Sequence, residues 1–385
     1  MSRDISSLDR YLEKEGIDGY LLDASQEESD QLYLSDFTGP DPFVTLYDGQ
    51  THLLVSGLEY GRAQTESRAD SVERHADYDF EYGGREDRLD LYAEFVRSKG
   101  VDSVAMPRRA PVGTADGLRE RGLAVTVDTA GVIGESREVK TNTEVEYVAA
   151  TQEANEAALA AAERLLSEAT PGDGQLLHGG EPLTSERVKR EIEMTLLEHG
   201  CALDETIVAC GGQAADPHDR GAGPLEPGEP IIIDIFPRDK TSKYHADMTR
   251  TFVVGSPDEQ LEEWFSLTQE ALKEALATVE PGATGEAVHA AACDVYENAG
   301  LPTLRAEPDT ETGFIHSTGH GVGLDVHEGP SLSPRGGELE AGHIITVEPG
   351  LYDPAIGGVR IEDIVAVTAD GYRNLTDYPI ELVVE

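Results

Sequence analysis

The sequence predicts an α+β fold in two domains, the second of which contains one arrangement of elements twice. The chain has 385 residues, too many for one ordinary core, and 39% of them are hydrophobic. Short strand-like runs and a helical segment mix in the first third. After residue 140, the order helix, Pro-Gly, helix ending at Gly, then strands occurs twice. We therefore expect one domain over residues 1–140 and another over 141–385.

The net charge excludes several classes of partner. Asp and Glu number 75 against 30 Lys and Arg, which gives a net charge of −45 and a pI near 4.4. Such a polyanion repels nucleic acids and anionic membranes. The acids are spread over the whole length and lysine is scarce, a composition that resembles proteins of halophilic archaea with concentrated internal salt. An acidic interaction tail is the alternative, but no block of acids is long enough to form one.

Cysteine usage and the N-terminal residues predict a cytoplasmic protein. The chain has three cysteines, Cys201, Cys210 and Cys293, without a CxxC pair or a disulfide framework, as expected for a reducing compartment. The first residues are polar and lack the apolar stretch of a signal peptide. No apolar run approaches the ~18 residues of a membrane helix.

The N-terminal domain is expected to be a mixed α/β structure. Apolar runs predict strands at 18–24, 43–49, 51–57, 101–107 and 122–131, and apolar residues at helical spacing predict a helix at 88–100. Asp48-Gly49 between two of these strands indicates a hairpin. Residue types that carry chemistry do not cluster here, so we expect a structural or substrate-covering role.

The C-terminal domain reads as two similar halves. Thr143 to Glu146 match a capping box that opens a long helix toward residue 168, and Val188, Ile192 and Leu196 share one face of a second helix at 185–200. Strands follow at 205–212, 230–236 and 244–255. The second half repeats this order, with helices at 258–279 and 284–300 and strands at 314–321, 343–350 and 358–367. An internal duplication about a pseudo-twofold axis is the simplest interpretation.

Four carboxylates occupy matching places in the two halves. Asp234 ends the apolar run IIID and Asp247 lies 13 residues later, whereas Glu348 follows IITV and Glu362 lies 14 residues later. Each pair suits a hairpin with one acid on each arm, pointing to the same face. Four acids gathered in one buried site would repel one another and take up protons unless metal ions neutralised them.

One imidazole completes a possible metal site. His320, in the glycine-rich stretch STGHGVGLDVHEGP, joins the four carboxylates as a fifth ligand, enough for two ions about 3.5–4 Å apart. This donor set favours Mn²⁺, with Co²⁺ or Zn²⁺ possible. Since Asp and Glu make up about a fifth of the chain, spacing alone is weak evidence. Stronger evidence for a metal site is that Asp234 and Glu348 end apolar runs, where burying an unpaired charge would cost free energy.

These segments resemble the pita-bread metallopeptidases, which include aminopeptidase P, prolidase, methionine aminopeptidase and creatinase. The matching motifs, in the order of that family, are IIIDIF, HADMTRTFVVG, HSTGHGVGLDVHEGP, ITVEPGLY and VRIEDIVAV. They cover residues 143–385, and the first domain resembles the creatinase-type N-terminal domain in placement and size. The resemblance implies a pita-bread fold with that smaller α/β domain in front, commonly as a homodimer.

The resemblance also implies residue roles. The metal ligands would be Asp234, Asp247, His320, Glu348 and Glu362, with Asp247 and Glu362 bridging two ions. Further members of the implied site are His218, His316, His327 and Arg360. His218 precedes the first ligand strand, and His316 and His327 flank His320. Arg360 would orient Glu362 or bind substrate, with a plain salt bridge as the rival interpretation.

The implied reaction is hydrolysis of small peptides after the first residue, where proline follows. A hydroxide bridging the ions would attack the carbonyl, and Glu348 would act as general base. His327 would steady the oxyanion, while His218 and His316 would shape the pocket. The alternatives are a creatinase-type C–N hydrolase and a non-catalytic binding protein on the same fold.

Two departures from the family pattern affect the expected specificity. The link between Asp234 and Asp247 is two residues longer than in most relatives. His245 within it is open to several interpretations: it supports a ligand, gates the site or acts as an extra ligand, and simple hydrogen bonding to solvent is favoured over ligation. In prolidase-like relatives an arginine after the DVHE-type motif binds the dipeptide carboxylate. Here Ser331 lies near that place and Arg335 follows. A preference for dipeptides over longer peptides therefore stays open.

Overall fold

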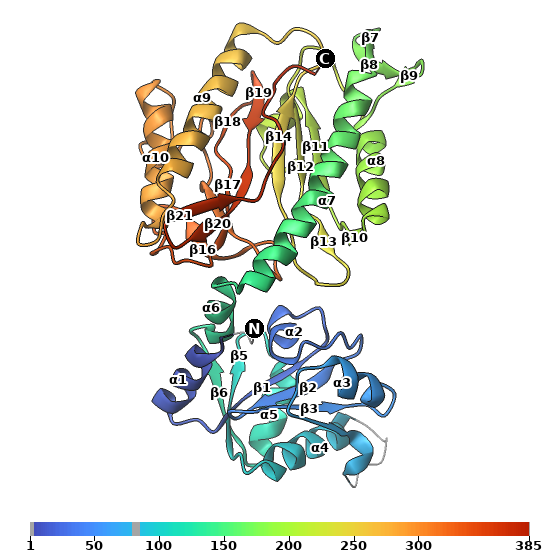
Figure 1. Cartoon of the computed structure of the whole chain (residues 1–385), viewed down its shortest axis with the longest axis vertical. Helices are drawn as coiled ribbons and strands as arrows, with labels where there is room; N and C mark the ends of the chain where they lie inside the picture. The colour runs from blue at the N-terminus through green and yellow to red at the C-terminus, as the bar shows by residue number, and fades with distance from the viewer. Residues whose placement is uncertain (1–3, 79–84, 385) are drawn as a thin grey trace. The chain divides into compact units, whose positions relative to one another are not determined.

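The computed structural model describes residues 4–78 and 85–384 (Figure 1). The chain divides into two compact units, Ser2–Arg137 and Glu138–Glu385, hereafter the N-terminal and C-terminal units. Within the described ranges, no helix combines the length and the apolar character needed to cross a membrane.

The N-terminal unit is built on a six-stranded sheet with the order β4-β3-β2-β1-β5-β6. Its strands are β1 (Gly19–Ala24), β2 (Phe43–Tyr47), β3 (Thr51–Val55), β4 (Ser71–Arg74), β5 (Ser103–Pro107) and β6 (Ala124–Asp128). The β2–β3 hairpin turns at Asp48 to Gln50, where Gly49 has a φ of 101°, so the predicted hairpin is confirmed. β1 pairs antiparallel with β2 and parallel with β5, which makes the sheet mixed.

Helices surround this sheet, and only the longest of them was predicted. They are α1 (Ser6–Glu15), α2 (Ser29–Ser35), α3 (Tyr60–Glu66), α4 (Arg85–Ser98), α5 (Val112–Glu120) and α6 (Val132–Glu138). α2 and α3 have seven residues each and no side-chain cap, so they leave little periodic signal in the sequence. Phe95 and Val96 of α4 pack with Leu21, Val44 and Val104 in the core of this unit.

The first half of the C-terminal unit pairs two helices with a three-stranded sheet. α7 (Asn142–Ser167) and α8 (Ser185–Glu198) pack beside β11 (Thr206–Cys210), β12 (Ile231–Ile235) and β14 (Met248–Phe252), whose order is β11-β12-β14. The predicted capping box was misplaced by two residues. Thr141 accepts the Glu144 N–H, and the Glu144 carboxylate accepts the Thr141 N–H, so the TxxE pair begins at Thr141.

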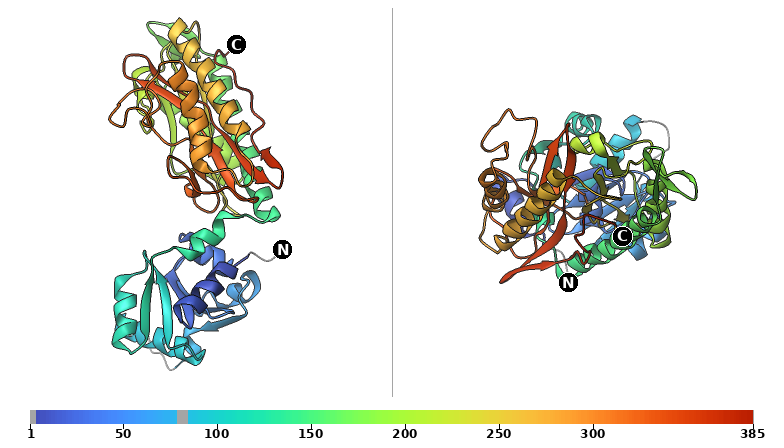
Figure 2. Two further views of the ribbon diagram at one scale, coloured as in Figure 1. Left: turned by 90° about the vertical axis from the view of Figure 1, so that its left-hand side faces the viewer. Right: turned by 90° about the horizontal axis from the view of Figure 1, so that it is seen from above.

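The second half repeats this plan with a larger sheet. α9 (Glu259–Ala277) and α10 (Gly285–Asn298) lie side by side, as Figure 2 shows. The sheet order is β16-β15-β17-β20-β21. Its strands are β15 (Gly319–Gly321), β16 (Glu328–Leu332), β17 (Ile344–Val347), β20 (Asp363–Thr368) and β21 (Gly371–Asn374). The predicted repeat of two helices followed by antiparallel strands is therefore present in both halves.

Three small additions interrupt this repeat. They are a ribbon of β18 (Gly350–Asp353) and β19 (Gly357–Arg360), a meander of β7 (Thr170–Gly172), β8 (Gln175–His178) and β9 (Glu181–Pro182), and a pair of β10 (Cys201–Ala202) with β13 (Arg238–Asp239). The longer link between Asp234 and Asp247 contains β13. Its extra length therefore forms a short strand pair with β10.

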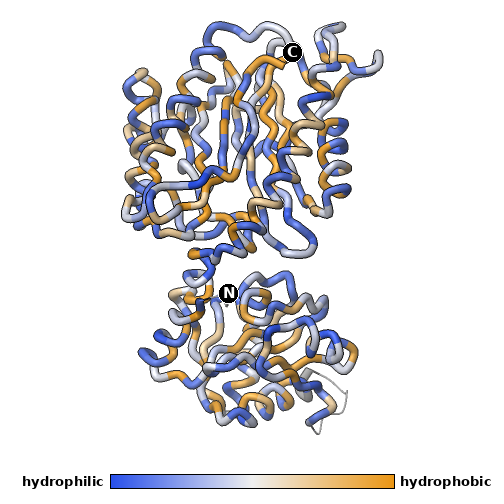
Figure 3. Tube along the Cα trace, viewed as in Figure 1, coloured by the Kyte–Doolittle hydropathy of each residue, from blue (hydrophilic) through white to orange (hydrophobic). Residues whose placement is uncertain are grey.

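The two halves meet along β14. The Glu362 N–H donates to the Thr249 carbonyl (3.0 Å), and the Arg360 N–H donates to Thr251 Oγ1 (2.9 Å). Apolar residues run along the central strands (Figure 3), with α7 and α8 on one side and α9 and α10 on the other (Figure 1). This junction brings the acidic ends of both sheets together.

Candidate metal centre

The first half supplies two buried carboxylates on neighbouring strands. Asp234 is the fourth residue of β12 and pairs in register with Thr249 of β14, and Asp247 directly precedes β14. Asp234 is 9% exposed and Asp247 is 5% exposed. β12 is the central strand of its sheet and is buried along its whole length, so it holds Asp234 in the interior.

The second half supplies Glu348 and Glu362 at the same end of its sheet. Glu348 directly follows β17, Glu362 directly precedes β20, and the register pairs Val347 with Asp363. The simple hairpin expected from the sequence is wrong in one respect, because the β18–β19 ribbon lies between the two acids. Glu348 and Glu362 flank that ribbon rather than a tight turn.

His320 lies in the middle of β15 and faces these carboxylates. Its Nδ1 is 3.1 Å from the Gly321 carbonyl oxygen, so this nitrogen carries the proton and donates it. Its Nε2 is then unprotonated, and lies 3.8 Å from Asp247 Oδ2 and 3.5 Å from Glu348 Oε1. Gly319 lets the backbone of β15 pack closely against Thr346 of β17, since a Cβ at residue 319 would collide with the Thr346 carbonyl.

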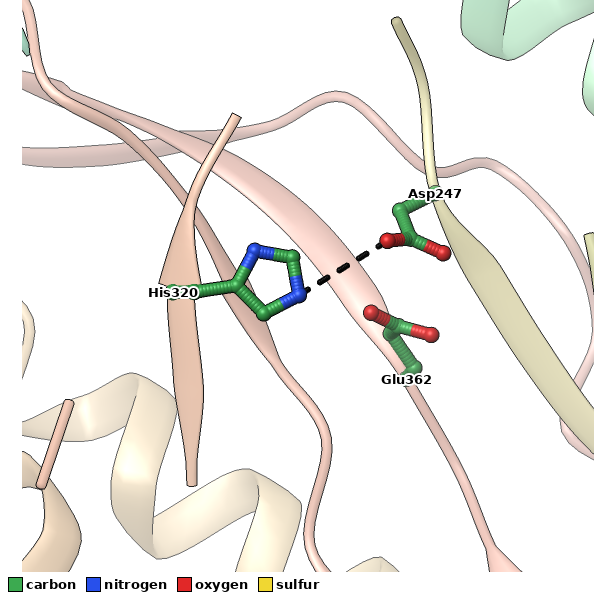
Figure 4. A group of neighbouring side chains, drawn as sticks. All are labelled: Asp247, His320 and Glu362. Carbon is green, nitrogen blue, oxygen red and sulfur yellow. Dashed lines mark ion pairs between the residues drawn. The ribbon is translucent and has the colours of Figure 1, made fainter. Parts of the chain in front are cut away.

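The five predicted ligands converge in one region. Donor atoms of Asp247, His320 and Glu362 all lie within 4.8 Å of one another (Figure 4). Glu348 adjoins His320, and Asp234 acts electrostatically on Asp247, Glu348 and Glu362. Elements far apart in the sequence therefore place four acids and one imidazole around a common point.

The electrostatics of this cluster are unfavourable for the protein alone. Burial, with Glu362 nearby, raises the pKa of Asp247 well above its ordinary value, and burial with Glu348 nearby does the same for Glu362. Burial raises the pKa of Glu348 to about 7. Asp234 Oδ1 is buried and has no hydrogen-bond partner among the described residues. Divalent cations would neutralise these charges and use that oxygen, so the donor set fits hard metal ions.

Arg360 lies beneath the cluster and pairs with a different acid from the one expected. Its Nη2 donates to Asp234 Oδ2 (2.6 Å), Nε to Thr249 Oγ1 (3.2 Å) and Nη1 to the Tyr352 hydroxyl (3.0 Å). The side chain is buried, with 3% of the residue exposed. The salt-bridge interpretation therefore describes its contacts, and the partner is Asp234 rather than Glu362.

His316 is half-buried, and both of its ring nitrogens are engaged. Nδ1 lies 2.7 Å from the Ser317 carbonyl oxygen and Nε2 lies 3.0 Å from the Tyr352 hydroxyl. Burial and the neighbouring Arg360 lower the pKa of His316 to about 3, so the ring is neutral. A neutral ring that donates from Nδ1 accepts from Tyr352, whose oxygen in turn accepts from Arg360.

His218 and His327 are exposed and lie near the cluster. The His327 ring stands edge-on to the His320 ring, with the centroids 4.3 Å apart. Burial and His320 lower the pKa of His327. His218 contributes to the low pKa of both His316 and His327, so it lies within electrostatic range of both rings.

The residues named as departures from the family pattern, His245, Ser331 and Arg335, differ in their environments. The His245 N–H donates to the Gly323 carbonyl (2.8 Å), and its buried Nδ1 has no partner among the described residues. His245 is not part of the group whose donor atoms converge. Ser331 pairs in register with His320 across β15 and β16 and is exposed, so both side chains share one face of the sheet. Arg335 is exposed beyond the end of β16.

Three supporting residues were missed by the sequence analysis. Thr249 Oγ1 donates to Glu362 Oε2 (2.7 Å), Thr346 Oγ1 lies 3.4 Å from Glu348 Oε1, and Tyr352 links Arg360 to His316. Thr249 lies two residues after Asp247, and Thr346 lies two before Glu348. Alternation along a strand puts such residues on the face of the ligand, which is the signal that could have identified them.

Comparison with known proteins agrees with this arrangement. Residues 149–369 match the model of metallopeptidase family M24, and residues 5–139 match the creatinase/prolidase N-terminal domain. The chain is 29% identical to an Xaa-Pro dipeptidase of Pyrococcus horikoshii over 393 aligned positions, covering 100% of this chain and 99% of that protein. The solved structure of an Xaa-Pro dipeptidase from Bacillus anthracis matches with a TM-score of 0.83 at 27% identity, covering 99% of both chains. That of an X-Pro aminopeptidase from Thermotoga maritima matches with a TM-score of 0.78 at 25% identity, covering 96% of this chain and 98% of the other.

The duplicated fold and the buried acid–imidazole cluster define a metal-dependent hydrolase. The chain belongs to metallopeptidase family M24, with a creatinase-type domain in front. The predicted fold class is thereby confirmed, and divalent metal ions are the cofactors of a peptidase of this family.

Proposed function

We propose that the protein is an Xaa-Pro peptidase that hydrolyses the bond between an N-terminal residue and a following proline. The observation that carries this proposal is the convergence of four carboxylates, three of them buried, and one imidazole from both halves of the C-terminal unit. Relatives named Xaa-Pro dipeptidase, which match the whole chain, support the choice of substrate.

Two divalent ions would be held by the predicted ligand set Asp234, Asp247, His320, Glu348 and Glu362, with Asp247 and Glu362 shared between them. Mostly carboxylate ligands with one imidazole favour Mn²⁺, and Co²⁺ or Zn²⁺ also suit them. When bound, such ions supply Lewis acidity for the substrate carbonyl and a lowered pKa for water.

The chain's own residues would hold and move protons around this centre. Glu348 takes the proton of the attacking water and passes it to the prolyl nitrogen. His327, exposed beside His320, donates a hydrogen bond to the oxygen of the tetrahedral intermediate. His218, which is exposed and within electrostatic range of His316 and His327, would contact the peptide.

The remaining residues would fix orientation. The Gly321 carbonyl holds the His320 ring through Nδ1, so Nε2 points to the carboxylates. Arg360 holds Asp234 in place through a charged hydrogen bond, and through Tyr352 it also sets the His316 ring. We assign His316 and Arg360 to shaping the pocket, since their polar atoms already have protein partners.

Peptides longer than two residues are the second candidate class of substrate, and Ser331 is the observation that favours them. Ser331 shares a face with His320 and is exposed. An uncharged hydroxyl at this position offers no strong partner for the carboxylate of a dipeptide, and it leaves space for a continuing chain.

The test is turnover of Ala-Pro, of a tripeptide with proline in second place and of creatine, measured with Mn²⁺ at high salt. Hydrolysis of dipeptides alone would identify a dipeptidase, and hydrolysis of the tripeptide an aminopeptidase. Turnover of creatine alone would support the creatinase-type alternative. Binding of these compounds without turnover would support a non-catalytic protein and contradict the peptidase proposal.

The composition supports a further proposal about the cell. We propose a cytoplasmic homodimer of a halophilic organism, since a net charge of −45 requires concentrated salt to screen its self-repulsion. The melting temperature should then rise steeply with KCl concentration. Sedimentation at high salt should give twice the mass of one chain.

A further inference from the structure

His327 lies in the connection between β15 and β16, and strand pairing fixes both ends of this connection. The register pairs His320 with Ser331 and then Gly321 with Glu328, so the strands close into a short loop over residues 322–327. His327 is the last residue of this loop, and its ring packs edge-on to His320. The position of His327 therefore depends on what anchors Glu328, its neighbour in the chain.

The Glu328 carboxylate turns into the interior beneath this loop. Its side chain is only 4% exposed, and Oε1 accepts the Asp325 N–H (2.9 Å). A Cβ at Gly323 would collide with the same carboxylate, so the loop backbone closes directly around it. A carboxylate buried in this way must be paired or it will take up a proton.

Lys140 supplies a positive charge to this carboxylate. Its Nζ lies 3.2 Å from Glu328 Oε2, and its side chain is 2% exposed. The Lys140 backbone is itself fixed, because its N–H donates to the Gly342 carbonyl (2.9 Å). The lysine backbone is thus held next to Gly342, shortly before β17, and its side chain reaches Glu328 at the end of the loop that contains His327.

We propose that Lys140 is a positioning residue for His327, acting through the buried Lys140–Glu328 ion pair. The inference rests on the proposed peptidase function, in which His327 contacts the reacting oxygen. Loss of the lysine removes a buried positive charge 3.2 Å from Glu328, which weakens the hold on this carboxylate and lets the adjoining loop shift. His327 moves with that loop, while the five predicted ligands keep their own contacts.

The experiment compares Lys140→Met, Glu328→Gln and the double variant, each with two Mn²⁺ per chain verified by elemental analysis. Lys140→Met should lower kcat by about 10- to 100-fold, as expected for misplacement of a catalytic group, with a smaller change in KM. The double variant removes both charges and should recover most of the loss. Arg305→Met is a control, since it removes another cation that pairs with acids, Asp294 and Glu297.

A purely structural role is separated by repeating Lys140→Met in a His327→Ala background. A positioning role predicts no further loss of kcat there, whereas a general weakening of the fold lowers kcat by the same factor in both backgrounds and overturns the proposal. Denaturant unfolding of each variant reports stability separately.

A readout independent of turnover completes the test. With carbon-13-labelled histidine and with diamagnetic Zn²⁺ in place of Mn²⁺, Lys140→Met should shift the His327 resonance and the double variant should restore it, while the His289 resonance stays unchanged in both. An unmoved His327 resonance would contradict the proposal. If the wild-type protein hydrolyses no Xaa-Pro peptide, the proposed function fails, and this measurement still decides whether Lys140 positions His327.

Discussion

The two halves of the C-terminal unit contribute to the centre in different ways. In the first half, Asp234 and Asp247 belong to adjacent strands of a regular antiparallel sheet. In the second half, a ribbon separates Glu348 from Glu362, strand β15 adds His320, and the loop after it adds His327. The carboxylates are shared equally, but every residue assigned to proton transfer lies in the second half. A duplicated fold can therefore divide its work, with one copy holding charge and the other also carrying chemistry.

Removal of metal tests what the halves have in common, and it should have the largest effect. Dialysis against a chelator should abolish turnover and lower the melting temperature, because the acids of both halves then repel one another. Ions present at 100 times their dissociation constant stabilise the folded state by about 2.7 kcal/mol. Calorimetry with and without Mn²⁺ measures this difference. A chelated protein that keeps its activity would contradict a metal-dependent reaction.

Substitution of Glu348 tests the division of work. Glu348→Ala should lower kcat by at least about 10²- to 10⁴-fold, because it removes the general base as well as a ligand. Circular dichroism should show an unchanged fold. Glu340→Ala, which removes an exposed acid a few residues earlier, is the control and should leave kcat unchanged. Near-normal rates in Glu348→Ala would show that the base lies elsewhere.

Thr249→Val tests how the first half supports a ligand of the second. The hydroxyl donates to Glu362 and accepts from Arg360, so its loss should weaken metal affinity by about 10- to 100-fold. Titration of the metal-free protein with Mn²⁺ measures the affinity. Thr268→Val, which removes another buried hydroxyl that contacts Tyr296, should not change it. Equal affinities in both variants would mean that Thr249 plays no part in holding Glu362.

A change at Ser331 sharpens the substrate assignment. Ser331→Arg places a cation on the face of His320, so the ratio of dipeptide to tripeptide turnover should rise by about tenfold, which corresponds to one charged hydrogen bond. Competition assays with both substrates measure the ratio. The wild-type protein already has an arginine a few residues later, Arg335, and it is exposed. An unchanged ratio would mean that the substrate carboxylate does not reach this face.

Acid should act on a histidine of the second half through the stability of the fold and not through turnover. Burial and nearby Lys140 lower the pKa of His343 to about 4, whereas an unfolded chain has the ordinary value near 6.5. The unfolded state then binds more protons between pH 6.5 and 4, so stability falls as the pH drops through that window, by on the order of 3 kcal/mol. In His343→Gln, denaturant unfolding should depend less on pH across this range. An identical pH dependence would exclude this contribution.

The sequence predicted the elements that carry strong local signals. Val188, Ile192 and Leu196 are fully buried on α8, and the apolar run that ends at Asp234 forms the central strand β12. Local patterns failed where tertiary contacts decide the structure. The β18–β19 ribbon interrupts a span that reads as a simple hairpin, and the capping box begins two residues before the expected threonine.

Local patterns also identified the candidate ligands of the centre but not the contacts between distant residues that support them. Asp234 and Glu348 stand out because they end apolar runs, and the glycines around His320 mark a close approach of backbones. The partner of Arg360 was not predictable, because Asp234 lies 126 positions away in the chain and only folding brings them together. The Lys140–Glu328 pair, separated by 188 positions, is hidden for the same reason.

The most direct test of the account is a crystal structure grown with Mn²⁺, with the ions located by their anomalous scattering. We expect two ions in the C-terminal unit, coordinated by Asp234, Asp247, His320, Glu348 and Glu362, with Asp247 and Glu362 touching both. Manganese bound elsewhere, or not bound at all while these five side chains stay apart, would contradict it.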